Sequence, residues 1–395
     1  MKYYEYQGLC LCPVGGRLPS GAAETAHRFA PLCYLVDRDP AISRCLWEIS
    51  DAAELDAPED WRMLLPRMGQ GSMAVLNTAF PRCFEMLPRL LRPKTAGLRL
   101  TLVGLGDVGG TLLTALKLLG EEIDEIGIYD PCQALVERYC LELGQVLGRK
   151  TPRIVPRAPE ALFDCDLFLF AASLGVPPVG AGGDVRMAQF EKNREMLKQY
   201  AKMARENHFT GLFCQISDPV DLLARSVFLQ SNRDPAGNFD WQGLLPEQVV
   251  GFGLGVMSAR AAYYARQLDL NEDKIAVFGP HGAGLVAAND CENYDSELSE
   301  ELTRKTVEAN RVVRALGFKP YIAPALSSAC LSILDLVRGR PFYGAIPMGG
   351  VYFGCRCVRG AFGFAPVHQP LHERLQARIE RAWTELKEME PQCRQ

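Results

Sequence analysis

The chain has 395 residues, of which 48% are hydrophobic and 23% charged, a composition typical of globular proteins. This length predicts two or three domains rather than one compact core. The net charge of -4 argues against nucleic acid as a partner, because phosphate binding needs a clustered basic surface that the sequence lacks. We therefore expect small molecules as ligands.

The first residues, MKYYEYQ, lack the basic start and apolar core of a secretory signal, and no stretch is long and apolar enough to span a membrane. The fourteen cysteines are scattered along the chain, which predicts reduced thiols in the cytoplasm rather than a disulfide framework. Two C-x-C pairs, Cys10 with Cys12 and Cys355 with Cys357, differ in spacing from the C-x-x-C of many zinc sites. We expect buried apolar side chains there, and no metal site.

Residues 1–95 mix short apolar pieces with glycine and proline breakers and contain no recognisable motif. We predict three or four strands here, with short helices near 41–54 and 81–91. The sequence leaves three roles open for this N-terminal extension: a small additional domain, a dimerisation element, or a cover over a nucleotide site.

A dinucleotide-binding motif is predicted between residues 98 and 130. The apolar run 98–103 suits a strand buried on both faces, and a glycine turn of the form G-x-G-x-x-G leads from it into a helical pattern. Such a turn lets a pyrophosphate approach the backbone at a helix N-terminus, and an acid at the end of the next strand can bind the ribose hydroxyls. The predicted cofactor residues are Gly104, Gly106, Asp107, Val108, Gly109 and Asp130. The alternative is a glycine-rich turn in an unrelated α/β protein.

The segments that follow alternate strand and helix up to about residue 230, which predicts a Rossmann-type parallel sheet. We place this dinucleotide-binding domain at 96–235 and an α+β substrate domain at 236–395. The fold class is therefore α/β with an additional small N-terminal region. Strands are expected at 153–155, 167–172, 211–216 and within 343–364, and helices near 131–147, 185–207, 295–316, 326–338 and 368–389.

His281 is the best candidate for acid–base chemistry among the five histidines, because glycines flank it in GPHG directly after an apolar run. A histidine on a tight turn at a strand end can exchange a proton near neutral pH, although a hydrogen-bonded turn residue has the same pattern. Arg186 and Arg260 offer guanidinium groups that could bind a carboxylate or polarise a carbonyl, or they are ordinary surface arginines.

Over about residues 98–390 the chain resembles the lactate/malate dehydrogenase family. The resemblance rests on LVGLGDVGG, IGIYD, AASLGVPP, the R-x-x-x-x-x-x-N run from Arg186 to Asn193, ISDPVDLLA, LPEQVVGFG followed by MSAR, and FGPHGAG. It implies that the glycine turn and Asp130 bind NAD, and that Arg260 holds a substrate carboxylate. It further implies that Arg186 closes over the carbonyl, that His281 is the acid/base, and that the protein forms homo-oligomers, either dimers or tetramers.

The chain departs from this family at the histidine. The family's L-D-S-A-R supplies an aspartate that orients the histidine, but here the segment reads VMSAR and Met257 takes that place. The family's S-N-P-V-D reads SDPVD, so that Asp218 replaces an amide near the nicotinamide. We expect Asp218 either to replace the missing partner as a catalytic residue or to disfavour a negatively charged substrate. The polar residue after the family's HG is also lost, because the chain reads HGAG.

The loop 174–185 bears on the substrate. It contains no basic residue, which disfavours malate and oxaloacetate, whereas Pro178 and Val179 favour an apolar 2-oxo acid side chain. The leading hypothesis is an NAD-dependent oxidoreductase acting on a 2-hydroxy acid or its oxo form. The second is a dinucleotide-binding paralogue that has lost catalysis and acts as a sensor or partner subunit. A third is a redox module that acts through cysteines or a metal.

Overall fold

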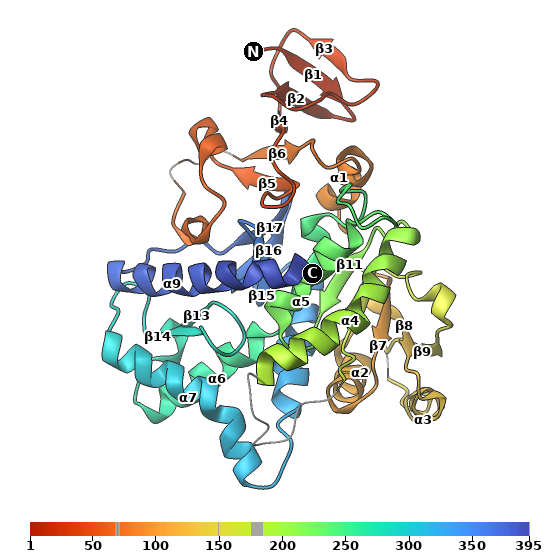
Figure 1. Ribbon diagram of the computed structural model, residues 1–395, viewed down its shortest axis with the longest axis vertical. Helices are drawn as coiled ribbons and strands as arrows, with labels where there is room; N and C mark the ends of the chain where they lie inside the picture. Colours follow the sequence, from red (N-terminus) through yellow and green to blue (C-terminus); the bar gives the residue numbers. More distant parts are fainter. Residues whose placement is uncertain (68, 70–71, 149, 175–184, 395) are drawn as a thin grey trace.

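The computed structural model describes residues 1–67, 69, 72–148, 150–174 and 185–394, and the side chains of 185–188 lie outside this description. The described part of the chain forms two large sheets and a third sheet of only two strands. A six-stranded sheet formed by the N-terminal extension makes up one end of the molecule, and a nine-stranded sheet with its helices makes up the larger body (Figure 1).

The nine-stranded sheet has the order β17-β16-β15-β12-β11-β10-β7-β8-β9. Its strands are β7 (Leu98–Val103), β8 (Ile123–Tyr129), β9 (Arg153–Pro156), β10 (Leu167–Phe170), β11 (Leu212–Gln215), β12 (Val249–Gly251), β15 (Phe342–Met348), β16 (Val351–Gly360) and β17 (Gly363–Pro366). From β7 to β12 the strands pair in parallel in the doubly wound order 3-2-1-4-5-6, while β15, β16 and β17 are antiparallel. The order reverses between β7 and β10, which is where such sheets bind ligands.

The apolar runs explain why these strands lie in the middle of the sheet. All four residues of β10 are buried, and in β7 only Arg99 is exposed, so both faces of these strands are covered. The predicted Rossmann-type fold is confirmed, as are the predicted strands at β9, β10 and β11. The sheet continues past residue 235 into β12 and β15 to β17, and the proposed domain division at that residue stays a prediction.

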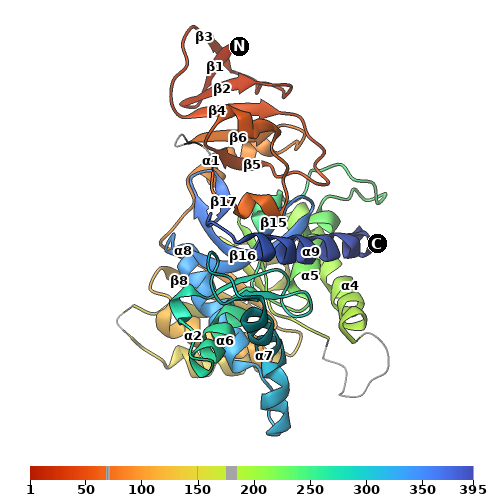
Figure 2. The same ribbon diagram turned by 90° about the vertical axis from the view of Figure 1, so that its left-hand side faces the viewer.

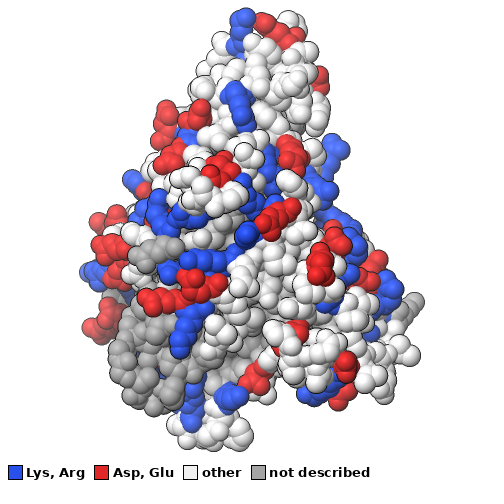
Figure 3. Space-filling view, turned by 45° about the vertical axis from the view of Figure 1, so that its right-hand side comes forward, with Lys and Arg blue, Asp and Glu red and all other residues white. Residues whose placement is uncertain are grey.

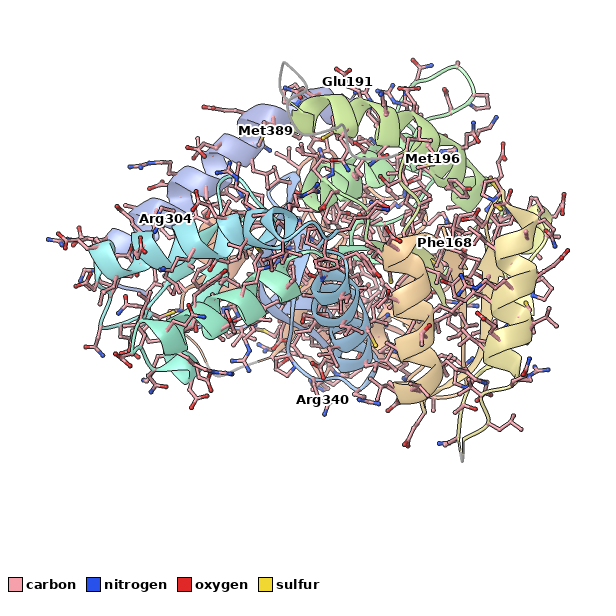
Figure 4. All side chains as sticks on the ribbon, turned by 90° about the horizontal axis from the view of Figure 1, so that it is seen from below. Phe168, Glu191, Met196, Arg304, Arg340 and Met389 are labelled. Carbon is pink, nitrogen blue, oxygen red and sulfur yellow. The ribbon has the colours of Figure 1, made fainter. Side chains whose placement is uncertain are left out.

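Helices cover both faces of the sheet. They are α2 (Asp107–Leu119), α3 (Gln133–Gly144), α4 (Val185–Glu206), α5 (Val220–Ser231), α6 (Leu254–Gln267), α7 (Ser296–Ala315), α8 (Ser332–Val337) and α9 (Glu373–Met389). The helix predicted near 326–338 consists of a π-helical segment, Pro324–Leu331, followed by α8. Seen from below, α2 lies between α3 and this π-helical segment, and α4 with Glu191 and Met196 crosses above them (Figure 4).

The N-terminal extension differs from its prediction. It forms six strands in the order β3-β1-β2-β4-β6-β5, not three or four. The strands are β1 (Tyr3–Tyr6), β2 (Leu9–Pro13), β3 (Ala23–Thr25), β4 (Leu32–Val36), β5 (Leu46–Ile49) and β6 (Met73–Asn77). The predicted helix near 41–54 is wrong, because Trp47 and Ile49 pack on one face of β5 and Leu46 on the other, which requires a strand. The helix predicted near 81–91 is confirmed as α1 (Cys83–Leu91).

Buried polar contacts join the extension to the larger body. Glu247, which precedes β12, accepts backbone N–H bonds from Cys45 (2.8 Å) and Leu46 (3.2 Å) through Oε1. Arg225 of α5 donates from Nη2 to the carbonyl oxygen of Ala41 at 2.6 Å. The extension sits at one end of the molecule, and α2, α6 and α7 lie at the other (Figure 2).

The surface and the cysteines bear on the broad predictions. Acidic and basic side chains are interspersed over the face shown in Figure 3. None of the helices in the described part of the chain is both long and apolar enough to cross a bilayer. All fourteen cysteines are free thiols. Both C-x-C pairs are buried, as predicted, and burial raises the pKa of the Cys357 thiol well above its usual value.

Candidate active site

The glycine turn after β7 is shaped by close backbone contacts. Gly104 has a φ of +93°, and a Cβ there would lie 2.5 Å from the backbone nitrogen of Ala172. A Cβ on Gly109 would lie 1.8 Å from the carbonyl oxygen of Gly104. Gly106, the residue before α2, faces open space, with no atom within 4 Å of a built Cβ. The turn therefore excludes side chains at two positions and leaves room for a ligand at the third.

Asp130 lies beside this turn at the end of β8. Its Oδ2 accepts the backbone N–H of Leu105 at 2.8 Å, and its Oδ1 accepts that of Cys132 at 2.9 Å. Each carboxylate oxygen can accept a further hydrogen bond, so these contacts leave acceptor capacity for hydroxyl groups. Asp130 thus meets the glycine turn just before the N-terminus of α2, although it lies 25 positions beyond Leu105 in the sequence.

A pocket of about 160 Å³ opens at the carboxyl ends of β7, β10 and β11. Val108 of the glycine turn lines it together with Asp218 and His281, so the predicted cofactor site and the predicted acid–base site share one cavity. The other lining residues are Ala171, Ser173, Gln189, Ile216, Ser217, Val220, Phe252, Gly253, Pro324 and Ser328. No described lining residue belongs to the extension, so the pocket gives no support to its expected role as a cover.

His281 sits in the turn between β13 (Ala276–Phe278) and β14 (Val286–Ala288). Its Nδ1 lies 2.7 Å from Oδ1 of Asp218, and 12% of its side chain is exposed. The backbone N–H of His281 donates to Oδ2 of Asp221 at 3.0 Å. A Cβ on Gly253 would lie 2.9 Å from the Cβ of His281, so only glycine allows this approach. Two carboxylates of the SDPVD segment therefore hold the histidine, one at its ring and one at its backbone.

Asn193 fixes the loops on either side of the pocket. This buried residue of α4 donates from Nδ2 to the carbonyl oxygen of Asp218 at 2.8 Å. Its Oδ1 accepts the backbone N–H of Leu174 at 3.0 Å. The sequence pointed to Asn193 only as part of a motif and to Asp221 only as part of another. The hydrogen-bonding roles of Asn193 and Asp221 could not be assigned from the sequence, because the groups that they bind are distant in sequence.

Arg260 and Met257 lie on α6. Met257 is buried in an apolar cluster, and its Sδ lies 3.9 Å from Nη1 of Arg260. Nη2 of Arg260 donates to Oδ1 of Asn310 on α7 at 2.5 Å. Burial lowers the pKa of Arg260, and the negative charge of Asp218 opposes this shift. Arg260 is thus within electrostatic reach of Asp218, but it is not among the described residues that line the pocket.

Arg186 lies in the first turn of α4, and its side chain is outside the described part of the chain. Pro178 and Val179 are also outside it. The roles expected for these three residues therefore stay predictions. Among the described side chains, no group of three or more His, Cys, Asp and Glu has a geometry that could hold a metal ion.

No family model matches the chain. L-lactate dehydrogenase 2 of Staphylococcus aureus (strain JH9) is 28% identical over 194 residues, which is 48% of this chain and 56% of that protein. The match thus spans little more than half the length of this relative.

Solved structures match a larger part of the chain. A lactate dehydrogenase from a Medee basin deep-sea metagenome library and the malate dehydrogenase from Aeropyrum pernix each give a TM-score of 0.62, at 18% and 19% identity. Both matches cover 75% of this chain, and 99% and 100% of those chains. The malate dehydrogenase from Archaeoglobus fulgidus in complex with NADH gives 0.61 at 18% identity, over 75% of this chain and 99% of that one. At these identities the likeness shows the fold.

The strand order and the glycine turn at the switch point define a doubly wound α/β protein of the Rossmann type. Within that class, the chain is similar to lactate and malate dehydrogenases, the proteins that its motifs resemble.

Proposed function

We propose that the protein is an NAD-dependent oxidoreductase that transfers a hydride between a nicotinamide and a 2-hydroxy/2-oxo carboxylate. The observation that carries this proposal is the His281–Asp218 pair, 2.7 Å apart, in a pocket that also reaches the glycine turn at Val108. Hydride transfer at a carbinol carbon needs a group that moves the hydroxyl proton, and an imidazole beside the cofactor site can supply it. Lactate and malate dehydrogenases among the similar proteins support the same reaction class.

The residues present fit a nicotinamide dinucleotide. The open space over Gly106 and the backbone N–H groups at the start of α2 suit the pyrophosphate, and Asp130 suits the ribose hydroxyls. Asp130 favours NAD, because a carboxylate repels an added phosphate on the ribose. When bound, the cofactor would supply the hydride acceptor.

In this mechanism His281 takes the hydroxyl proton as the substrate is oxidised and returns it in the reverse direction. Asp218 holds the ring and stabilises its protonated form, the role that Met257 cannot perform. Asp221 keeps the backbone of the turn in place. The His281 side chain is largely buried whereas that of Asp218 is half-exposed, so solvent screens part of their interaction.

Arg260 is the proposed substrate-binding residue. Its guanidinium is partly desolvated and, among the described residues, donates a hydrogen bond to Asn310 and contacts the sulfur of Met257. A substrate carboxylate entering from the pocket would replace part of this arrangement with a charge-assisted pair, which is roughly twice as strong as a neutral hydrogen bond. We further propose that Arg186 closes over the carbonyl from the start of α4.

The substrate side chain is proposed to be apolar rather than a second carboxylate. Apolar residues dominate the described lining, including Ile216, Val220, Phe252 and Pro324. Asp218 adds a negative charge, which disfavours a dicarboxylate such as malate. We also propose that the protein forms a homo-oligomer, either a dimer or a tetramer, and that it is located in the cytoplasm.

The second candidate function is a dinucleotide-binding paralogue without turnover. The observation that favours it is Arg260, which is engaged by Asn310 and does not line the pocket, while Met257 replaces the family's aspartate. Such a protein would bind NADH and 2-oxo acids without reacting.

The test uses the purified full chain with NADH and a panel of 2-oxo acids, namely pyruvate, phenylpyruvate and oxaloacetate, followed by NADH absorbance. We expect oxidation with an apolar 2-oxo acid, slower oxidation with oxaloacetate, and a loss of about a hundredfold or more in kcat for His281→Ala. NADH binding without oxidation by any member of the panel would favour the second function. Activity that is unchanged in His281→Ala would contradict the proposed mechanism.

A further inference from the structure

An ion pair stands at the entrance to the glycine turn. Nζ of Lys319 lies 3.0 Å from Oδ2 of Asp107, although the two residues are 212 positions apart. Asp107 is the first residue of α2, and Lys319 lies in the segment between α7 and the π-helical segment Pro324–Leu331. That π-helical segment packs along α2 (Figure 4), which holds Lys319 near the N-terminal end of this helix.

Asp107 is an unfavourable residue for a phosphate site. The N-terminus of a helix attracts one anion, and a first-turn carboxylate already benefits from that partial positive charge. A pyrophosphate bound over Gly106 would bring negative charge next to the Asp107 carboxylate. Without compensation, the side chain and the ligand would compete for the same end of α2.

Folding stability does not explain the pair. The side chain of Lys319 is 80% exposed and that of Asp107 47% exposed, and ion pairs of this kind contribute little to stability. The ammonium group has three N–H donors, of which Asp107 uses one. The remaining donors are carried on a solvent-exposed side chain that contacts Asp107, the residue directly after Gly106.

We propose that Lys319 is a cofactor-binding residue that offsets the charge of Asp107 and thereby lets the pyrophosphate of a dinucleotide bind at the start of α2. The inference rests on the proposed dinucleotide site but not on catalysis. It predicts that Lys319 matters for ligands that carry phosphate, and that it matters mainly because Asp107 is present.

The experiment measures the affinity of the full chain for ADP-ribose and for adenosine by titration calorimetry, using a double-mutant cycle. Lys319→Gln is expected to weaken ADP-ribose binding about tenfold and to leave adenosine binding unchanged. In an Asp107→Asn background the same substitution is expected to cost less than about threefold. Lys202→Gln is the matched control, because Lys202 is similarly exposed (71%) and pairs with Glu206 on α4, away from the turn.

Each outcome decides the inference. An ADP-ribose affinity of Lys319→Gln equal to that of wild type or of Lys202→Gln would overturn it, as would a parallel loss of adenosine binding. An equal loss in the two backgrounds would show that Lys319 acts independently of Asp107 and would also overturn it. If wild type itself bound no ADP-ribose, the proposed dinucleotide site would fail together with this inference. If wild type bound ADP-ribose and Lys319→Gln bound it equally well, only the inference about Lys319 would be contradicted.

Discussion

The ring nitrogen Nδ1 of His281 lies 2.7 Å from the carboxylate oxygen Oδ1 of Asp218. By family resemblance the histidine's partner is expected on α6, where this chain has Met257, but the contacting carboxylate comes from the loop after β11 instead. Of the two roles that the sequence left open for Asp218, this contact supports that of a partner to the histidine. In this chain the carboxylate that contacts the ring therefore comes from the loop after β11 and not from α6.

Asp218→Asn should lower kcat by about a hundredfold or more, because an amide cannot stabilise the protonated imidazole. Met257 is uncharged and cannot take over this role. KM for the 2-oxo acid should change much less. Steady-state kinetics across pH, with circular dichroism to verify folding, would check this. Asp240→Asn is a suitable control, since that carboxylate pairs with Arg205 outside the pocket. A variant with wild-type kcat would remove Asp218 from the mechanism.

Met257→Asp, introduced into the Asp218→Asn variant, should restore at least about tenfold of the lost kcat. The double variant recreates the arrangement of the family motifs, with an amide after β11 and a carboxylate on α6. The new carboxylate would lie near the guanidinium of Arg260, whose Nη1 is 3.9 Å from the sulfur of Met257, so its burial is offset by charge. Steady-state kinetics of the single and double variants would measure how much of the lost kcat is restored. A folded double variant that is no faster than Asp218→Asn would contradict the orienting role.

Asn193→Ala should reduce both stability and turnover. The substitution leaves the buried backbone carbonyl of Asp218 and the N–H of Leu174 without their present partner, at a cost of about 1–3 kcal/mol in the free energy of unfolding. Because both loops border the pocket, kcat/KM should fall more than stability alone explains. Urea unfolding and kinetics at a temperature where the variant is fully folded would separate the two effects. Turnover equal to wild type under those conditions would show that the loops need no such anchor.

Local patterns predicted the core of the fold well. The apolar runs of β7 and β10, the glycine turn and Asp130 are each set by a few neighbouring residues, and the doubly wound order follows from alternating strands and helices. The N-terminal extension was predicted less well, since β5 is buried on both faces. Its apolar residues therefore lack the strict alternation that identifies a half-buried strand.

Apart from the His281–Asp218 contact, which was one of two roles expected for Asp218, the contacts that join distant segments could not be predicted. Asp221 binds the backbone of His281 across 60 positions, and Asn193 binds that of Asp218 across 25. Nothing in the local sequence distinguishes these side chains from ordinary polar residues of a helix. The same holds for Glu247, which lies in a family-like motif and contacts the extension. Polar groups acquire such roles only when the chain is folded.

Gly106→Ala should leave stability unchanged and weaken NADH binding by about tenfold or more. A Cβ at this position meets no protein atom within 4 Å, so the fold can accept it, but the methyl group would occupy the space proposed for the pyrophosphate. Gly144→Ala is the matched control, because that glycine at the end of α3 also faces open space. Fluorescence titration with NADH and thermal melts would be compared for both variants. Equal NADH affinities would argue against a phosphate at Gly106.

Glu247→Gln should change the pH dependence of stability. Burial raises the pKa of the Glu247 carboxyl from 4.5 to about 7, and Oε2 has no hydrogen-bond partner among the described residues, while Oε1 accepts two backbone N–H bonds. The pKa of Glu247 is higher in the folded state than in the unfolded state. At pH values between these two pKa values, the folded state therefore binds one more proton than the unfolded state. This contribution to stability is complete below about pH 4.5 and is lost as pH rises through about 7.

Glutamine keeps an acceptor for Cys45 and Leu46 but cannot ionise. The variant should therefore be more stable than wild type at pH 8 by about 1–3 kcal/mol, with the difference shrinking toward pH 5. Urea unfolding at both pH values measures this difference directly. The effect should concern the junction between the extension and β12 and not the pocket, so kcat at neutral pH should be unchanged. A difference in unfolding free energy that does not vary with pH would show that Glu247 is not protonated on folding in this range.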